Sequence, residues 1–126
     1  MSAPPLLECR GIGKRFGETV VLEGVDLTLP AGEIHGLVGT NGAGKSTLMK
    51  ILAGAIPQHD GTILIDGHPV FLNSPAAALR MGVAMVYQEL SGIGPLSVAE
   101  NLFLGRQPTR RGGRIDWRGM FTAARQ

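Results

Sequence analysis

The sequence predicts an α/β fold whose N-terminal part is an antiparallel β subdomain. Residues 6–12 and 20–29 are rich in strand-forming residues, and the second run alternates apolar with polar side chains, as half-buried antiparallel strands do. Residues 33–38 form a short apolar run that leads through a glycine-rich loop into a segment of helical periodicity. A buried strand followed by a helix is the building unit of α/β folds, so the chain is expected to have this class.

The remaining elements follow from turn residues and helix caps. A Pro-Ala-Gly turn at 30–32 separates the second strand from the run at 33–38, which we expect to be a buried strand. The other expected strands are 61–67, 70–72 and a second buried strand at 83–87. The expected helices are 46–53, ended by Gly54, 75–80, capped by Asn73 or Ser74 and ended near Gly82, 97–104, opened by a Ser97–Glu100 capping box, and 116–125.

Length and composition indicate one cytoplasmic domain with a core. The 126 residues are 44% hydrophobic and 17% charged, which is too apolar for a disordered chain. A single cysteine, Cys9, excludes an internal disulfide framework, and the N-terminus lacks the pattern of a signal peptide. No uninterrupted apolar run is long enough to span a membrane.

The positive charge is concentrated in the last part of the chain. Residues 1–100 carry six Lys and Arg against nine Asp and Glu, whereas residues 101–126 carry six Arg against one Asp. A short basic segment of this kind can contact nucleic acid or anionic lipid. Because Trp117 is almost its only aromatic residue, we expect a solvated surface and no role in nucleic-acid binding.

The motif that carries chemistry is a P-loop, in which two glycines with four residues between them are followed by Lys and a hydroxyl residue. Its glycines allow backbone amides to approach phosphate oxygens, and the helix that follows presents a positive N-terminus. Lys45 is expected to contact the β- and γ-phosphates, Ser46 to bind Mg²⁺, and Thr47 to hold a phosphate nearer the base. A plain glycine-rich turn would explain neither Lys45 nor Ser46. The expected phosphate-binding residues are Gly39, Thr40, Asn41, Gly42, Ala43, Gly44, Lys45, Ser46 and Thr47.

A P-loop occurs in GTPases, kinases and transport ATPases alike, so it does not distinguish these classes. The flanking sequences make this chain resemble the ATP-binding subunit of ABC transporters, and in particular the first nucleotide-binding domain of bacterial monosaccharide importers. The resemblance covers nearly the whole chain. It rests on Lys14-Arg15-Phe16-Gly17, the run from Asn41 to Gly105, Val86-Tyr87-Gln88-Glu89 and Leu96-Ser97-Val98-Ala99-Glu100-Asn101-Leu102-Phe103-Leu104-Gly105.

The resemblance implies roles for three residues outside the P-loop. Phe16 would stack on the adenine, with Val21 as an apolar contact to the base. Gln88 would be the Q-loop glutamine, which binds Mg²⁺ and senses the γ-phosphate, so that Lys45 and Gln88 are the expected catalytic residues. Residues 89–96 would be a docking surface for membrane permease subunits, although a hinge would have the same composition.

Two features depart from the family pattern. Residues 90–94, Leu-Ser-Gly-Ile-Gly, imitate the family's signature sequence but follow the Q-loop too early and run into Pro95, so we do not interpret them as the signature. The chain also contains no Walker B strand ending in Asp-Glu and no switch histidine, and we interpret His35, His59 and His68 as structural or solvent-facing. We therefore expect a P-loop fold truncated before Walker B, with residues 1–105 as the N-terminal part of the nucleotide-binding domain and 106–126 as a basic connection into a helical subdomain.

The preferred interpretation is an ATP-binding part of an ATPase that powers sugar import at the inner face of the cell membrane. The resemblance implies ATP and Mg²⁺ as cofactors, and as partners the permease subunits, a second nucleotide-binding domain and, indirectly, a periplasmic sugar-binding protein. The truncated domain is expected to hydrolyse ATP poorly and to self-associate through its unpaired strand at 34–38. The alternative is a non-catalytic phosphate-binding or interaction fragment. A GTPase or small-molecule kinase is disfavoured, because the chain has no Asn-Lys-x-Asp motif.

Overall fold

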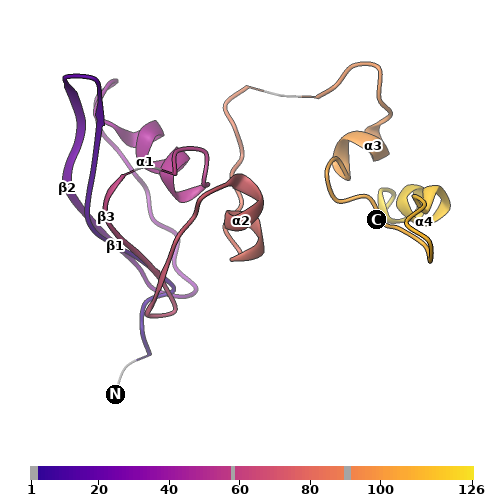
Figure 1. Ribbon diagram of the computed structural model, residues 1–126, viewed down its shortest axis with the longest axis horizontal. Coiled ribbons are helices and arrows are strands. Elements are labelled where there is room, and N and C mark those ends of the chain that lie inside the picture. The colour runs from indigo at the N-terminus through magenta and orange to yellow at the C-terminus, as the bar shows by residue number, and fades with distance from the viewer. Residues whose placement is uncertain (1–2, 58, 90–91) are drawn as a thin grey trace. The chain divides into compact units, whose positions relative to one another are not determined.

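A computed structural model describes residues 3–57, 59–89 and 92–126. The chain divides into two compact units, Met1–Val86 and Tyr87–Gln126, which are coloured indigo to salmon and orange to yellow in Figure 1. Each unit has its own secondary structure and is described separately below.

The first unit is built on a four-stranded antiparallel sheet in the order β2-β1-β3-β4. This arrangement confirms the predicted antiparallel subdomain. The first strand extends four residues beyond its predicted end at residue 12, because Phe16 still pairs with Thr19 across a tight turn in which Gly17 has φ 59°. The strands are β1 (Leu7–Phe16), β2 (Thr19–Leu29), β3 (Asp60–Ile65) and β4 (His68–Val70).

The helix α1 (Lys45–Leu52) covers one face of this sheet (Figure 1). It begins one residue before the predicted helix at 46–53 and ends one residue earlier. Alternate residues of the strands meet its apolar side, and β1 places Cys9 directly opposite Ile63 of β3. The buried residues of this core are Cys9, Ile12, Leu22, Leu48, Ile51, Leu52, Ile63, Leu72 and Ala78.

The short helix α2 (Pro75–Arg80) adds Ala78 to the same core. Its N-cap is Ser74 and not Asn73, because the Ser74 hydroxyl accepts a hydrogen bond of 3.1 Å from the amide of Ala77. The helix ends where Gly82 adopts φ 88°, as predicted.

The second unit contains α3 (Val98–Leu102) and α4 (Trp117–Ala123), which contact each other around the buried Met120. The predicted capping box at the start of α3 is confirmed: the Ser97 amide donates to Glu100, and the Glu100 amide donates to the Ser97 hydroxyl. Between the helices, Thr109 and Ile115 form an antiparallel bridge around a turn. Residues 109–115, which belong to the predicted basic connection, are thus a folded hairpin.

The predicted buried strands at 33–38 and 83–87 are wrong. Both segments lie outside the strands of the structure, and Ile34, Val38 and Val86 are each at least 90% exposed. An apolar run becomes a buried strand only when another strand pairs with its edge, and within residues 3–57, 59–89 and 92–126 none does. Residues 33–38 are exposed throughout, whereas in 83–87 Val83 and Met85 are half-buried and Val83 packs on the core.

Two expectations about organisation have different outcomes. The division into functional segments 1–105 and 106–126 stays a prediction, because the two units are defined by packing alone. None of the helices formed by the described residues has the length and apolar character needed to cross a membrane.

The buried Cys9 predicts a pH dependence of stability. Burial raises the pKa of its thiol from 9.0 to about 11, so the folded state holds this proton at a pH where the unfolded chain releases it. The free energy of unfolding is therefore expected to fall as the pH rises from about 9 to about 11. Urea unfolding at several pH values measures this, with Cys9→Ala as the control that should lose less stability over the range. If both proteins lost the same free energy of unfolding over this pH range, the loss would not come from the Cys9 thiol.

Candidate functional site

The P-loop is held against β2 by a contact that only glycine permits. Gly44 precedes α1 with φ 89°, a left-handed conformation, and it is buried. A Cβ at this position would lie 2.5 Å from Cδ2 of Leu22 and 2.8 Å from the carbonyl oxygen of Val21. Because neither the backbone of β2 nor the core residue Leu22 can move away freely, the loop reaches this position only without a side chain.

The loop and the first turn of α1 present a group of amides without protein acceptors. The amide of Ala43 donates to the Thr40 carbonyl at 3.2 Å, and the first bond of the helix runs from Leu48 to Gly44 at 2.9 Å. Between these two bonds, no backbone or side-chain acceptor within the described part of the chain takes the amides of Gly44, Lys45, Ser46 and Thr47. Such amides, together with the positive end of the helix, favour an anion.

Lys45 is bound by the loop itself. Its Nζ donates to the carbonyl oxygens of Gly39 at 2.6 Å and Thr40 at 2.7 Å. The side chain therefore folds back over the loop, with its charge at the Gly39 and Thr40 carbonyls. A phosphate that competes for this ammonium replaces two neutral acceptors with a charged one, which gives a stronger hydrogen bond.

The loop offers one protein ligand for a magnesium ion. Ser46, predicted to bind Mg²⁺, is exposed at the start of α1, and Thr47 beside it is half-buried. Mg²⁺ normally takes one or two oxygens from protein and the rest from phosphates and water, and one serine hydroxyl fits that pattern. The described residues contain no cluster of His, Cys, Asp and Glu that would hold a metal without phosphate.

Phe16 and Val21 lie on the hairpin that carries the loop. Phe16 is 50% exposed, and Nζ of Lys14 is 5.1 Å from the centre of its ring. Its partner Thr19 is two residues from Val21, a separation of about 7 Å along the strand. The hairpin therefore connects the exposed aromatic ring to the Gly44 end of the P-loop. Val21 itself is half-buried and packs on the core, so less of it is available to a base than predicted.

Gln88 belongs to the second unit, and its predicted place beside the Mg²⁺ site stays a prediction. Of the predicted docking segment and the signature-like sequence, Leu90 and Ser91 lie outside the described residues. The rest of the segment is fixed by Asn101 of α3. Its side chain accepts from the Ile93 amide at 2.7 Å and donates to the carbonyls of Ile93, Leu96 and Ser97. Residues 93–97 are therefore a defined turn.

Three contacts of this chain were missed by sequence reasoning. These are the bonds from Lys45 to its own loop, the contact of Gly44 with β2, and the clamp made by Asn101. The motif identifies Gly44 and Lys45 by spacing, yet their partners come from tertiary geometry. Two of the three histidines make local contacts. His35 pairs with Glu33 at 2.7 Å, and Nδ1 of His59 lies 2.9 Å from the carbonyl oxygen of Asp60.

Known proteins are similar to this chain over nearly its whole length. Residues 22–125 match the family described as ABC transporter. The chain is 55% identical over 122 residues to the ribose import ATP-binding protein RbsA 1 of Rubrobacter xylanophilus, and 49% identical over 126 residues to RbsA 2 of Escherichia coli O157:H7. These alignments cover 97% and 100% of this chain but only 24% and 25% of the two relatives. The chain thus spans about a quarter of the length of the curated relatives it matches.

Solved structures share the fold. A nucleotide-free ATP-binding cassette from an ABC transporter superposes with a TM-score of 0.73 at 26% identity, over 94% of this chain and 46% of that one. The ADP conformation of MJ1267, another such cassette, gives a TM-score of 0.71 over 94% of this chain and 45% of that one, also at 26% identity. The predicted fold class, a P-loop NTPase core with an N-terminal antiparallel β subdomain, agrees with both.

The contact of Gly44 with β2 can be tested by adding one methyl group. Gly44→Ala is expected to lower the free energy of unfolding by about 2–4 kcal/mol, because left-handed strain and the overlap with Val21 and Leu22 add together. Gly42→Ala is the matched control. Gly42 has φ 82° but nothing within 4 Å of the point that an added methyl group would occupy, so strain alone should cost about 1–2 kcal/mol. Equal losses in urea unfolding would contradict the contact.

Proposed function

The chain belongs to the ABC transporter family, and we propose that it is the N-terminal part of an ATP-binding subunit that powers carbohydrate import. The observation that carries the proposal is the group of unpaired amides at Gly44–Thr47 beside the Lys45 ammonium. This arrangement suits a polyphosphate, and the relatives named above are ribose import ATP-binding proteins.

We assign the phosphates of ATP to the loop residues 39–47. The amides of the first helical turn hold the phosphate oxygens, and Lys45 leaves the carbonyls of Gly39 and Thr40 to neutralise the β- and γ-phosphates. Ser46 supplies one oxygen to Mg²⁺, which balances the phosphate charge when bound. Thr47 contacts the phosphate nearer the base.

The base and the second catalytic residue are assigned to the flanking segments. The exposed ring of Phe16 stacks on adenine, with Val21 as a secondary apolar contact. Gln88 binds Mg²⁺ and senses the γ-phosphate, and residues 89–96 dock on permease subunits. Functionally, residues 1–105 are the first part of the nucleotide-binding domain, and 106–126 connect it to a helical subdomain.

In the whole protein the subunit works at the inner face of the cell membrane. Its partners are the permease subunits, a second nucleotide-binding domain and, through the permease, a periplasmic sugar-binding protein. This assignment is supported by relatives whose names describe import ATP-binding proteins. Closure of two such domains on ATP would drive the permease.

A non-catalytic interaction fragment is the second candidate, and the exposed apolar residues Ile34, Val38 and Val86 favour it. Exposed runs of this kind promote pairing between copies. Without a Walker B carboxylate, this chain alone is expected to bind ATP with little turnover and to self-associate. Since both candidates predict little turnover by this chain alone, sedimentation combined with an MgATP titration separates them: saturable binding that is lost in Lys45→Ala favours the first candidate, and self-association without nucleotide binding favours the second.

Removal of the Lys45 ammonium tests the proposed site. Lys45→Ala is expected to weaken MgATP binding by about 10-fold to 100-fold, the value of a charged hydrogen bond, in a calorimetric titration. Lys50→Ala is the matched control, because Lys50 is exposed in the last turn of the same helix and its loss should leave binding unchanged. Similar affinities for all three proteins would reject the assignment. Stronger binding of GTP than of ATP would favour the GTPase that the sequence disfavours.

A further inference from the structure

The second unit carries a cationic surface that the proposed ATP site does not use. Residues 92–126 contain six arginines and two acidic residues, Glu100 and Asp116. Both acids are engaged locally: Glu100 closes the capping box of α3, and Asp116 accepts from the Gly119 amide at 3.1 Å and pairs with Arg110 at 2.9 Å. These bonds lower the pKa of Asp116, so it stays ionised while most of the positive charge remains uncompensated.

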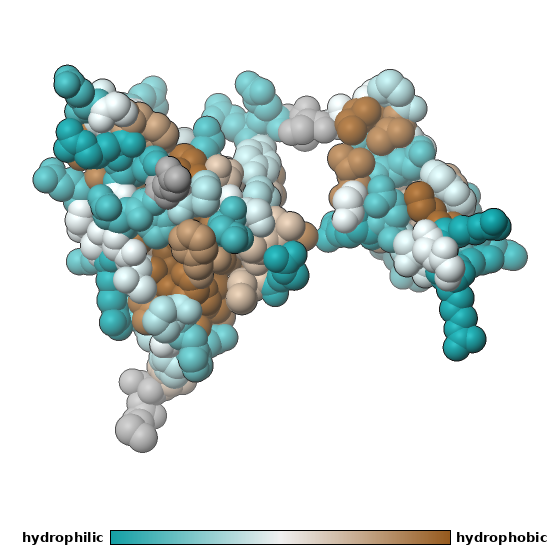
Figure 2. Space-filling model, in the orientation of Figure 1, coloured by the Kyte–Doolittle hydropathy of each residue, from teal (hydrophilic) through white to brown (hydrophobic). Residues whose placement is uncertain are grey.

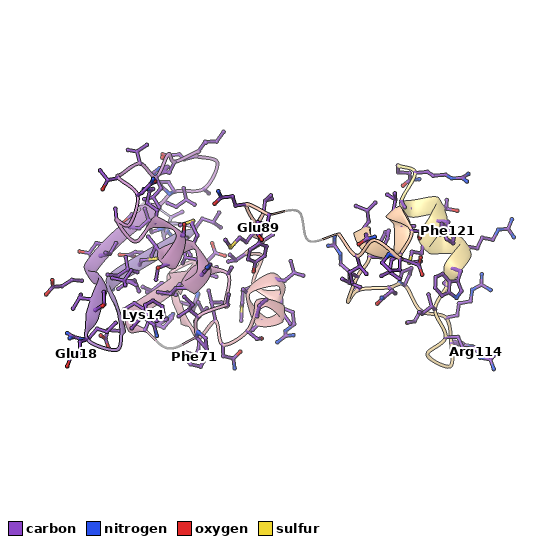
Figure 3. All side chains as sticks on the ribbon, turned by 90° about the horizontal axis from the view of Figure 1, so that it is seen from above. Lys14, Glu18, Phe71, Glu89, Arg114 and Phe121 are labelled. Carbon is purple, nitrogen blue, oxygen red and sulfur yellow. The ribbon has the colours of Figure 1, made fainter. Side chains whose placement is uncertain are left out.

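The hairpin and α4 order these arginines into one basic segment. The amide of Arg110 donates to the carbonyl of Arg114 at 2.9 Å, which places Arg110, Arg111 and Arg114 around one turn. Figure 3 shows Arg114 at the outer end of this turn, directed away from the helices. The chain then enters α4, where Arg118 and the Arg110–Asp116 ion pair border a hollow of about 390 Å³.

Exposed aromatic residues lie on the same helix. Trp117 and Phe121 are one turn apart on α4, 48% and 44% exposed, with their rings stacked at 6.4 Å between centroids. Arg118 follows Trp117 directly, and the buried Met120 anchors the helix against α3. In Figure 2 apolar patches on this unit are bordered by hydrophilic side chains.

We propose that the surface formed by residues 109–121 binds an anionic lipid surface. Arginines on the same hairpin and helix as exposed Trp and Phe match the interfacial region of a bilayer, where the charges meet headgroup phosphates and the aromatic rings enter the acyl boundary. Single-stranded nucleic acid fits less well, because Trp117 and Phe121 contact each other and residues 109–121 have no further aromatic side chains to take successive bases.

Trp117 is the only tryptophan of the chain, so its fluorescence reports the contact directly. With vesicles of equal parts phosphatidylglycerol and phosphatidylcholine, the emission is expected to shift to shorter wavelength and the chain to co-sediment. Vesicles of phosphatidylcholine alone should give weak binding. Glycerol phosphate in solution should give no shift and no displacement. Absence of a shift on the anionic vesicles would overturn the proposal, as would binding to a single-stranded oligonucleotide with none to vesicles.

Three double variants locate the surface. Arg111→Gln with Arg114→Gln is expected to lower the partition coefficient about 25-fold, at about fivefold for each arginine near the surface. Arg111→Lys with Arg114→Lys keeps the charge and should retain binding. Lys50→Gln with Arg80→Gln removes the same charge from the first unit and should change little. Equal effects of the two neutralising pairs would contradict a local surface. Lys45→Ala should bind vesicles normally, so the result is independent of the ATP site.

Discussion

The contact between Gly44 and the second strand is the constraint on which the candidate site depends. The sheet places the Val21 carbonyl and the Leu22 side chain where a Cβ on residue 44 would overlap them. Leu22 is itself fixed, because it is buried in the core with Ile51 of α1. The same packing that holds the helix on the sheet therefore sets the position of the loop, and the loop's amides are oriented before any phosphate arrives. Preorganisation of this kind lowers the cost of binding.

Electrostatics complement this geometry. In the structure the Lys45 ammonium is satisfied by two carbonyls of its own loop, so the site holds its positive charge without a bound anion. The four unpaired amides lie at the end of α1 where the helix dipole is positive. A polyphosphate would satisfy both sets of donors at once. Within the second unit, the hairpin at 109–115 holds Arg110, Arg111 and Arg114 around one turn.

Sequence reasoning succeeded where local chemistry decides the structure. Alternation identified the antiparallel strands, the spacing of Ser97 and Glu100 identified a capping box, and glycines marked the ends of helices. It failed for residues 33–38, whose side chains are exposed, and for 83–87, where Val86 is exposed and only Val83 packs on the core. Burial of a strand depends on a partner strand as well as on composition. At the site, spacing identified Lys45 and Ser46. The partners of Lys45 and Gly44 could not be predicted, since both depend on how β2 approaches the loop in three dimensions.

We propose that the amides of Gly44, Lys45, Ser46 and Thr47 form a prepared phosphate site. Amide nitrogen–proton NMR spectra recorded during a titration with MgATP test each of these residues separately. These four amides are expected to show the largest saturable shifts, with Ala43 and Leu48 affected less because each already donates to a carbonyl. Shifts confined to other parts of the chain, or none at saturating nucleotide, would contradict it.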